Sequence, residues 1–145
     1  MKRHPILIPI SREHHQVLLL AQLLKKDAPP YRGLPADRPG KIDYATKRYH
    51  ELLASHLRRD TDKLYPYLLH WPALEELLSE LNKKAERIRQ SFDELDQSFS
   101  IEQMDSLGHL LENYVRVKER VLFQSVQQSL SEAEMLALAK ALSNG

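Results

Sequence analysis

Residues 104–122 read MDSLGHLLENYVRVKERVL, and they decide how the whole chain is interpreted. Apolar residues recur there every three or four positions, which is the pattern of a helix with one buried face. The members of this stripe are Leu107, Leu110, Leu111, Tyr114, Val117, Val121 and Leu122. Lys118 lies on the same face, one helical turn from both Tyr114 and Leu122. An isolated ammonium is too costly to bury, so the pattern predicts that Lys118 has a charge partner or loses its charge.

The segment before this helix divides at prolines, glycines and capping residues. Ser11 is expected to cap a first helix that ends near Lys26. Residues 27–40 carry four of the eight prolines and two of the four glycines, so they are expected to form a loop. Further helices are expected at about 42–69, 72–99, 101–130 and 131–142.

Capping boxes mark the start of the last two helices. Ser-Ile-Glu-Gln begins at Ser100 and Ser-Glu-Ala-Glu begins at Ser131. Four long amphipathic helices with mostly short connections predict an all-α, up-down-up-down four-helix bundle. The fifth helix, at the C-terminus, is short and is expected to pack across one end. With 145 residues, the chain is expected to form a single domain, residues 1–145.

Composition excludes several classes of function. Twenty-one Lys and Arg residues against 20 Asp and Glu residues give a net charge of +1, so we expect no nucleic acid and no membrane as partner. The absence of cysteine excludes disulfides, thiolate metal sites and a cysteine nucleophile. The apolar run at the N-terminus is short and is interrupted by Pro5 and Pro9, unlike a signal peptide. We therefore expect a soluble cytoplasmic protein.

The phase of each apolar stripe shows which polar side chains face inward. His14 shares a face with the apolar residues of the first helix, although the run Leu18-Leu19-Leu20 leaves His15 as a weaker candidate. On the helix expected at 42–69, the inward stripe is Tyr49, Leu53, His56, Asp60, Leu64 and Tyr67. The inward polar residues of the later helices are therefore His56, Asp60, Tyr114 and Lys118. They lie at similar depths on their helices, so we expect them to meet near the middle of the bundle.

Three segments carry a family resemblance. They are KRHP…PISREHH within residues 2–15, HLRRDTDKLYPYL at 56–68, and LGHLLENYVRVKERVLF at 107–123. Together they resemble the hemerythrin-like family, in its bacterial branch of HHE cation-binding domains. That resemblance implies a bundle whose di-iron centre is held by histidines and by HxxxE pairs. It places the ligand positions at His14 (with His15 as the fallback), His56, Asp60, Leu81, Tyr114 and Lys118.

Three of these positions depart from the family pattern. Leu81 cannot bind a metal, Tyr114 is an unusual ligand, and Lys118 brings a positive charge. Reversible oxygen binding at a di-iron centre is therefore not expected. We expect the Lys118 ammonium to take over the charge role of the metal, with Asp60 as its counter-ion and with Tyr114, His14 and His56 completing a polar network.

Three interpretations of the function follow. The first is a metal-free binding or regulatory module with a degenerate metal site, no cofactor and no enzymatic activity. The second is a protein that binds a single iron or zinc ion through His14, His56 and Asp60, with His15 in a supporting position. The third is a redox enzyme, for which the sequence offers no catalytic constellation. We expect the first; the sequence points to no particular small-molecule or protein partner and to no oligomeric state.

Overall fold

The computed structural model describes residues 2–143, and this range contains helices and loops but no strand. The first long helix is α1 (Ile8–Leu24), which follows the 3-10 turn η1 (Pro5–Leu7). The next segment is continuous and consists of α2 (Arg38–Arg48), the π turn η2 (Tyr49–Leu53), α3 (Ala54–Arg59), the π turn η3 (Asp60–Leu64) and α4 (Tyr65–Leu68).

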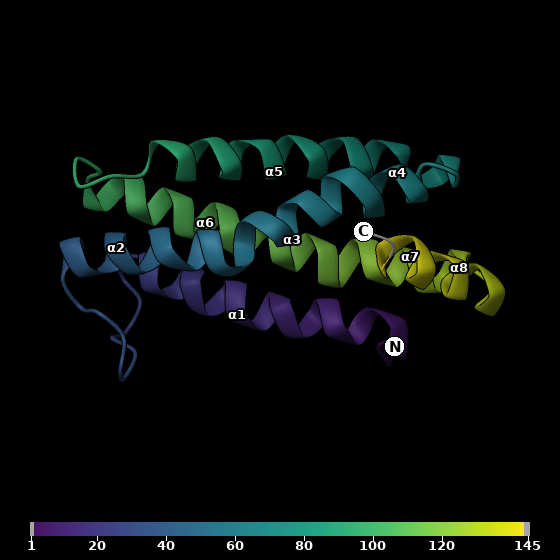
Figure 1. Ribbon diagram of the computed structural model, residues 1–145, viewed down its shortest axis with the longest axis horizontal. Coiled ribbons are helices and arrows are strands. Elements are labelled where there is room, and N and C mark those ends of the chain that lie inside the picture. Colours follow the sequence, from purple (N-terminus) through teal and green to yellow (C-terminus); the bar gives the residue numbers. More distant parts are fainter. Residues whose placement is uncertain (1, 144–145) are drawn as a thin grey trace.

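The second half of the chain is built in the same way. The 3-10 turn η4 (Pro72–Leu74) leads into α5 (Glu75–Glu94). A further continuous segment consists of α6 (Ile101–Val117), the π turn η5 (Lys118–Leu122) and α7 (Phe123–Ser129), and α8 (Glu132–Ser143) follows it. Figure 1 shows the long segments side by side along the longest axis, with α8 at one end. The all-α prediction is confirmed.

Helix boundaries differ from the prediction at several ends. The first helix begins at Ile8 rather than after Ser11, because Pro9 suits the first turn of a helix. The second segment begins at Arg38, again with a proline in its first turn, so the predicted loop is shorter. Helix α5 ends at Glu94, several residues before the predicted end.

Both predicted capping boxes are confirmed. At the start of α6, the backbone N–H of Gln103 donates to the Ser100 hydroxyl (3.1 Å) and the Ser100 N–H donates to the Gln103 side chain (2.7 Å). At the start of α8, Ser131 and Glu134 make the same reciprocal pair at 2.8 and 3.1 Å. These bonds satisfy N–H groups that a helix start otherwise leaves without a partner.

Because of the π turns, some residues that were predicted to face inward do not. A π turn contains one residue more than an α turn, so the residues after it are rotated by about 100° relative to an uninterrupted α-helix. After η3, Tyr65 is buried and Tyr67 is only partly buried, which is the reverse of the predicted phase. Within η5, Val121 is 47% exposed, and the buried aromatic residue that follows is Phe123. The sequence stripe was therefore wrong at Tyr67 and Val121.

Gly108 brings α1 and α6 close together. A Cβ atom at this position would lie 2.7 Å from the backbone oxygen of Ala21, so only glycine allows this distance between the two backbones. The contact matters for the site because α1 carries His14 and α6 leads directly into Lys118. Among residues 2–143, each helix is too short or too polar to cross a lipid bilayer.

Candidate functional site

Lys118 is completely buried and has the charge partner that the sequence requires. Its side chain is 0% exposed. The residue is the first of the π turn η5. The ammonium donates to Oδ2 of Asp60 at 2.5 Å and to Nε2 of His56 at 3.0 Å. Asp60, on the neighbouring segment, is also 0% exposed and begins the π turn η3. A cation and an anion thus neutralise each other inside the helical core.

Two tyrosines extend the network from Asp60. The Tyr114 hydroxyl donates to Oδ2 of Asp60 at 2.7 Å. Since this bond uses the Tyr114 proton, the hydroxyl of Tyr65 donates to that of Tyr114 at 2.5 Å. Both tyrosines are buried, and burial raises the pKa of each hydroxyl well above its usual value. Both are therefore neutral donors, Tyr114 to the Asp60 carboxylate and Tyr65 to the Tyr114 hydroxyl.

His56 connects the buried pair to the edge of the core. Because Nε2 of His56 accepts from Lys118, the ring proton lies on Nδ1, which donates to Glu13 at 2.8 Å. The Glu13 carboxylate also accepts from the Arg59 guanidinium at 3.0 and 3.1 Å. The hydrogen bond from His56 helps to lower the pKa of Glu13 to about 2. Glu13 is therefore ionised and fixes both the tautomer and the orientation of the imidazole.

His14 has an equivalent carboxylate partner. Its Nδ1 lies 2.6 Å from Oε2 of Glu119, which also accepts from the hydroxyl of Ser11 at 2.8 Å. The rings of His14 and His56 lie 5.0 Å apart, and His14 stacks on Phe123 at 5.6 Å. The Nε2 atom of His14 is buried and has no hydrogen-bond partner within residues 2–143. Each imidazole is thus held by a carboxylate at Nδ1, as metal-binding histidines usually are.

Burial and the Lys118–Asp60 contact determine the ionisation of the centre. Burial alone would raise the pKa of Asp60, but the Lys118 ammonium and the hydrogen bonds from Lys118 and Tyr114 together hold it below its usual value. Burial lowers the pKa of Lys118, and the Asp60 carboxylate opposes that effect. Burial, followed by the charge on Lys118, also lowers the pKa of His56. The favoured state is an ammonium, a carboxylate and a neutral imidazole.

The ionisation of His14 predicts loss of stability in acid. Burial and the Lys118 charge lower the pKa of His14 from 6.5 to about 4 in the folded protein. Between these values the unfolded chain binds a proton that the folded protein does not, so the free energy of unfolding falls as the pH falls from about 6.5 to 4. The loss is on the order of 3 kcal/mol. Urea unfolding across this range should show the slope, and His14→Phe should reduce it. An unchanged slope in His14→Phe would contradict this assignment.

The structure brings together His14, His56, Asp60, Tyr114 and Lys118, as the sequence analysis expected. Leu81 is buried in α5 and supplies only apolar atoms. His15 is exposed, and its side chain makes no hydrogen bond to any residue in 2–143, so it is not a supporting residue of this cluster.

Sequence reasoning missed Glu13, Glu119 and Tyr65. Glu13 precedes His14 and Glu119 follows Lys118, and neither carboxylate lies on the apolar stripe of its helix. Each reaches the histidine of another segment, Glu13 to His56 and Glu119 to His14. The usual pairing of metal-binding histidines with carboxylates would have been a signal for them. Tyr65 carried no such signal, because the π turn η3 changes the phase before it.

The side chains in this cluster do not fit a di-iron centre. Lys118 places an ammonium against the oxygen of Asp60 and the nitrogen of His56 that a metal would need. Leu81 offers no donor atom, and the Tyr114 hydroxyl is engaged with Asp60. In the described part of the chain, no group of three or more His, Asp or Glu side chains is arranged to hold a metal ion.

Comparisons with known proteins add no relative. No protein-family model, no curated protein and no solved structure matches the chain. The resemblance to hemerythrin-like proteins stays a prediction from the motifs.

Proposed function

We propose that this chain is a metal-free binding module built on a hemerythrin-like, up-down-up-down four-helix bundle. The observation that carries the proposal is the position of Lys118, which is 0% exposed and donates to both Asp60 and His56. At the ligand positions implied by the resemblance, an ammonium supplies the positive charge that a metal would otherwise supply.

The arrangement of the helices supports the proposed topology. The long segments run side by side, and short connections join α4 to α5 and α5 to α6 (Figure 1). Short connections favour antiparallel neighbours in a helical bundle. The polar centre links α1, the α2–α4 segment and the α6–α7 segment through hydrogen bonds, so it also helps to fix how these helices align.

The chemistry of the centre supports a structural role for it. Lys118 and Asp60 neutralise each other, and Tyr114 donates its proton to the same carboxylate. Buried charges are stable when they are paired and hydrogen-bonded, and such pairs can favour one packing arrangement over others. Because the buried polar groups bind one another, we expect a partner to bind to the surface of the bundle.

Metal content tests the proposal. Protein purified after growth with added iron or zinc is expected to contain far less than one metal ion per chain, because the Lys118 ammonium repels a cation. Elemental analysis of the purified protein measures this directly. Near-stoichiometric iron or zinc that disappears in His56→Ala would contradict the proposal.

A single-metal protein is the second candidate, and one observation favours it. Nε2 of His14 and Oδ1 of Asp60 are buried without hydrogen-bond partners in residues 2–143. A nitrogen and a carboxylate oxygen are ligands that iron and zinc both accept. Completing such a site with His56 would require Lys118 to give up its bond to Nε2, which is why we rank this candidate second.

Restoring the family ligands tests the proposed ancestry of the site. The variant with Leu81→His, Tyr114→His and Lys118→Glu is expected to bind iron and to gain near-ultraviolet charge-transfer absorption. The physical reason is that it replaces an apolar side chain, a hydroxyl and a cation with two imidazoles and a carboxylate. Lys118→Glu alone is the control and should bind little iron. If the triple variant folds but binds no iron, the assigned ligand positions are wrong.

A further inference from the structure

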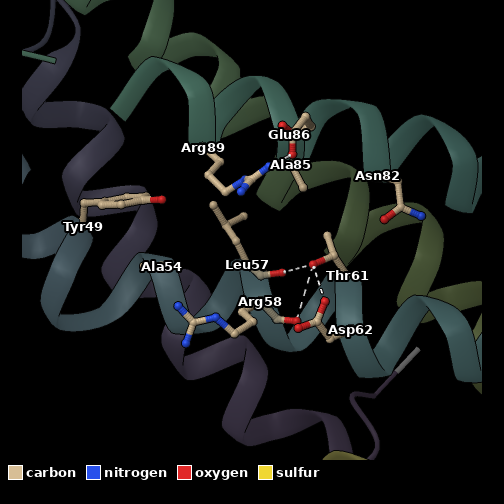
Figure 2. A pocket seen from close by; sticks show the side chains of 10 residues that line it. All are labelled: Tyr49, Ala54, Leu57, Arg58, Thr61, Asp62, Asn82, Ala85, Glu86 and Arg89. Atoms are coloured by element: carbon tan, nitrogen blue, oxygen red, sulfur yellow. Dashed lines mark hydrogen bonds and ion pairs between the residues drawn. The ribbon is translucent and has the colours of Figure 1, made fainter. Parts of the chain in front are cut away.

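A groove separates the α3–η3 segment from α5, outside the Lys118 cluster. Its volume is about 400 Å³, within the usual range for small-molecule sites. Figure 2 shows side chains from both walls around it. The floor contains Ala54, Leu57 and Ala85, and two of these side chains are small enough to leave the space open.

Tyr49 lines one end of this groove with an unused hydrogen-bonding group. The residue is only 7% exposed, and its ring stacks on Phe92 at 4.7 Å. Its hydroxyl points toward the groove in Figure 2 and has no hydrogen-bond partner within residues 2–143. Burial raises the pKa of Tyr49, so the hydroxyl keeps its proton and is a donor.

Two arginines accompany Tyr49, one from each wall. Arg58 extends from α3, and Arg89 extends from α5, where it pairs with Glu86 (Figure 2). Both arginines line the groove together with Tyr49, and because Glu86 pairs with Arg89, Arg58 is the guanidinium that is left to bind a ligand. Arg58 makes no ion pair in the described part of the chain. A phenol and an unpaired guanidinium together are well suited to a carboxylate.

The opposite end of the groove carries the complementary charge. Asp62 lies one helical turn after Arg58, yet the two form no ion pair within residues 2–143, and their charged groups point in opposite directions in Figure 2. The hydrogen-bond partner of the Asp62 side chain is the Thr61 hydroxyl, at a long 3.5 Å. Asn82 adds an amide from α5 at this end. A carboxylate with these neighbours is suited to an ammonium group.

We propose that this groove binds a linear aminocarboxylate, a molecule whose carboxylate and ammonium are separated by a short methylene chain. The carboxylate would contact Tyr49 and Arg58, the ammonium would contact Asp62, and the methylene groups would lie over Ala54 and Ala85. The inference rests on the proposed function, since it names a ligand for the binding module. Because the charged groups of Arg58 and Asp62 point in opposite directions in Figure 2, this class fits the groove better than a compact zwitterion.

Calorimetric titration of the full chain with δ-aminovalerate tests this inference. Valerate lacks the ammonium and pentylamine lacks the carboxylate, so each is expected to bind at least about tenfold more weakly. Arg58→Ala and Asp62→Asn should each weaken δ-aminovalerate binding by about tenfold or more, and Tyr49→Phe by about fivefold. Arg12→Ala removes an exposed arginine outside the groove and should leave binding unchanged.

Thermal unfolding of each variant identifies any that fails to fold, and Ala54→Leu gives a second way to block the groove. Absence of binding by γ-aminobutyrate, δ-aminovalerate and ε-aminocaproate would overturn the proposal. Equal binding of valerate, or binding that survives Arg58→Ala and Ala54→Leu, would overturn it as well. Metal content is measured separately from ligand binding. A bound metal would contradict the proposed function but would not test whether the groove binds an aminocarboxylate. Failure of the titrations would contradict the groove proposal but not the proposal of a metal-free core.

Discussion

Lys118→Ala is expected to lower the free energy of unfolding by about 3–5 kcal/mol. The substitution leaves the Asp60 carboxylate, 0% exposed, without its cation, and it also opens a cavity in the core. His56 loses the donor to its Nε2 atom at the same time. Urea or thermal unfolding measures the effect, and an unchanged melting temperature would show that the buried pair does not stabilise the fold.

Two controls separate the charge from the packing. Lys118→Met fills most of the volume of the lysine, so it should cost less than Lys118→Ala although it also leaves Asp60 unpaired. Lys25→Ala breaks a different lysine–carboxylate pair, Lys25 with Glu112 at 2.6 Å, whose side chains are 13% and 22% exposed. That pair is partly hydrated, so its loss is expected to cost about 1 kcal/mol or less. A cost for Lys25→Ala equal to that of Lys118→Ala would mean that burial is not the reason for the larger effect.

Asp60→Ala is expected to cost a similar amount, about 3–5 kcal/mol, since it leaves the Lys118 ammonium buried without an anion. The Tyr114 hydroxyl also loses its acceptor. Combining Asp60→Leu with Lys118→Met removes both charges and keeps apolar volume, so the double variant should be more stable than either single variant.

A double-mutant cycle on this pair measures their coupling. We expect about 2–3 kcal/mol, because the two groups are in direct contact in the core. Additive losses in the cycle would contradict a buried ion pair and would indicate that Lys118 and Asp60 act independently.

The part of the site that could be predicted lies where the α-helical period is undisturbed. His56 and Asp60 are one turn apart, as are Tyr114 and Lys118, and each pair precedes or begins a π turn. Their inward orientation therefore followed from the apolar residues on the same face. Beyond those turns the period fails, so the sequence pointed to Tyr67 where the structure buries Tyr65.

The carboxylates could not be predicted in the same way. Glu13 and Glu119 lie beside inward residues, at positions that an amphipathic pattern assigns to the outer faces of their helices. Each reaches across to an imidazole on another segment, a contact that depends on how the helices pack. Local sequence patterns report which face of a helix is buried, but they carry no information on which neighbour lies opposite.

The location of the π turns links the fold to the centre. Asp60 begins η3 and Lys118 begins η5, so both members of the buried pair lie where the helix widens. Such turns are rare and occur often at functional sites. Their presence on both segments fits a core shaped for a polar centre, in which Lys118 supplies the positive charge.

The most direct test of the proposal that Lys118 takes the place of a metal is X-ray diffraction from crystals grown with added iron and zinc. Anomalous data are collected at both absorption edges. We expect density for the Lys118 side chain that ends within hydrogen-bond distance of Asp60 and His56, with no anomalous peak among His14, His56 and Asp60. An anomalous peak for a metal ion bound by these three residues, or a Lys118 side chain that extends into solvent, would contradict the proposal.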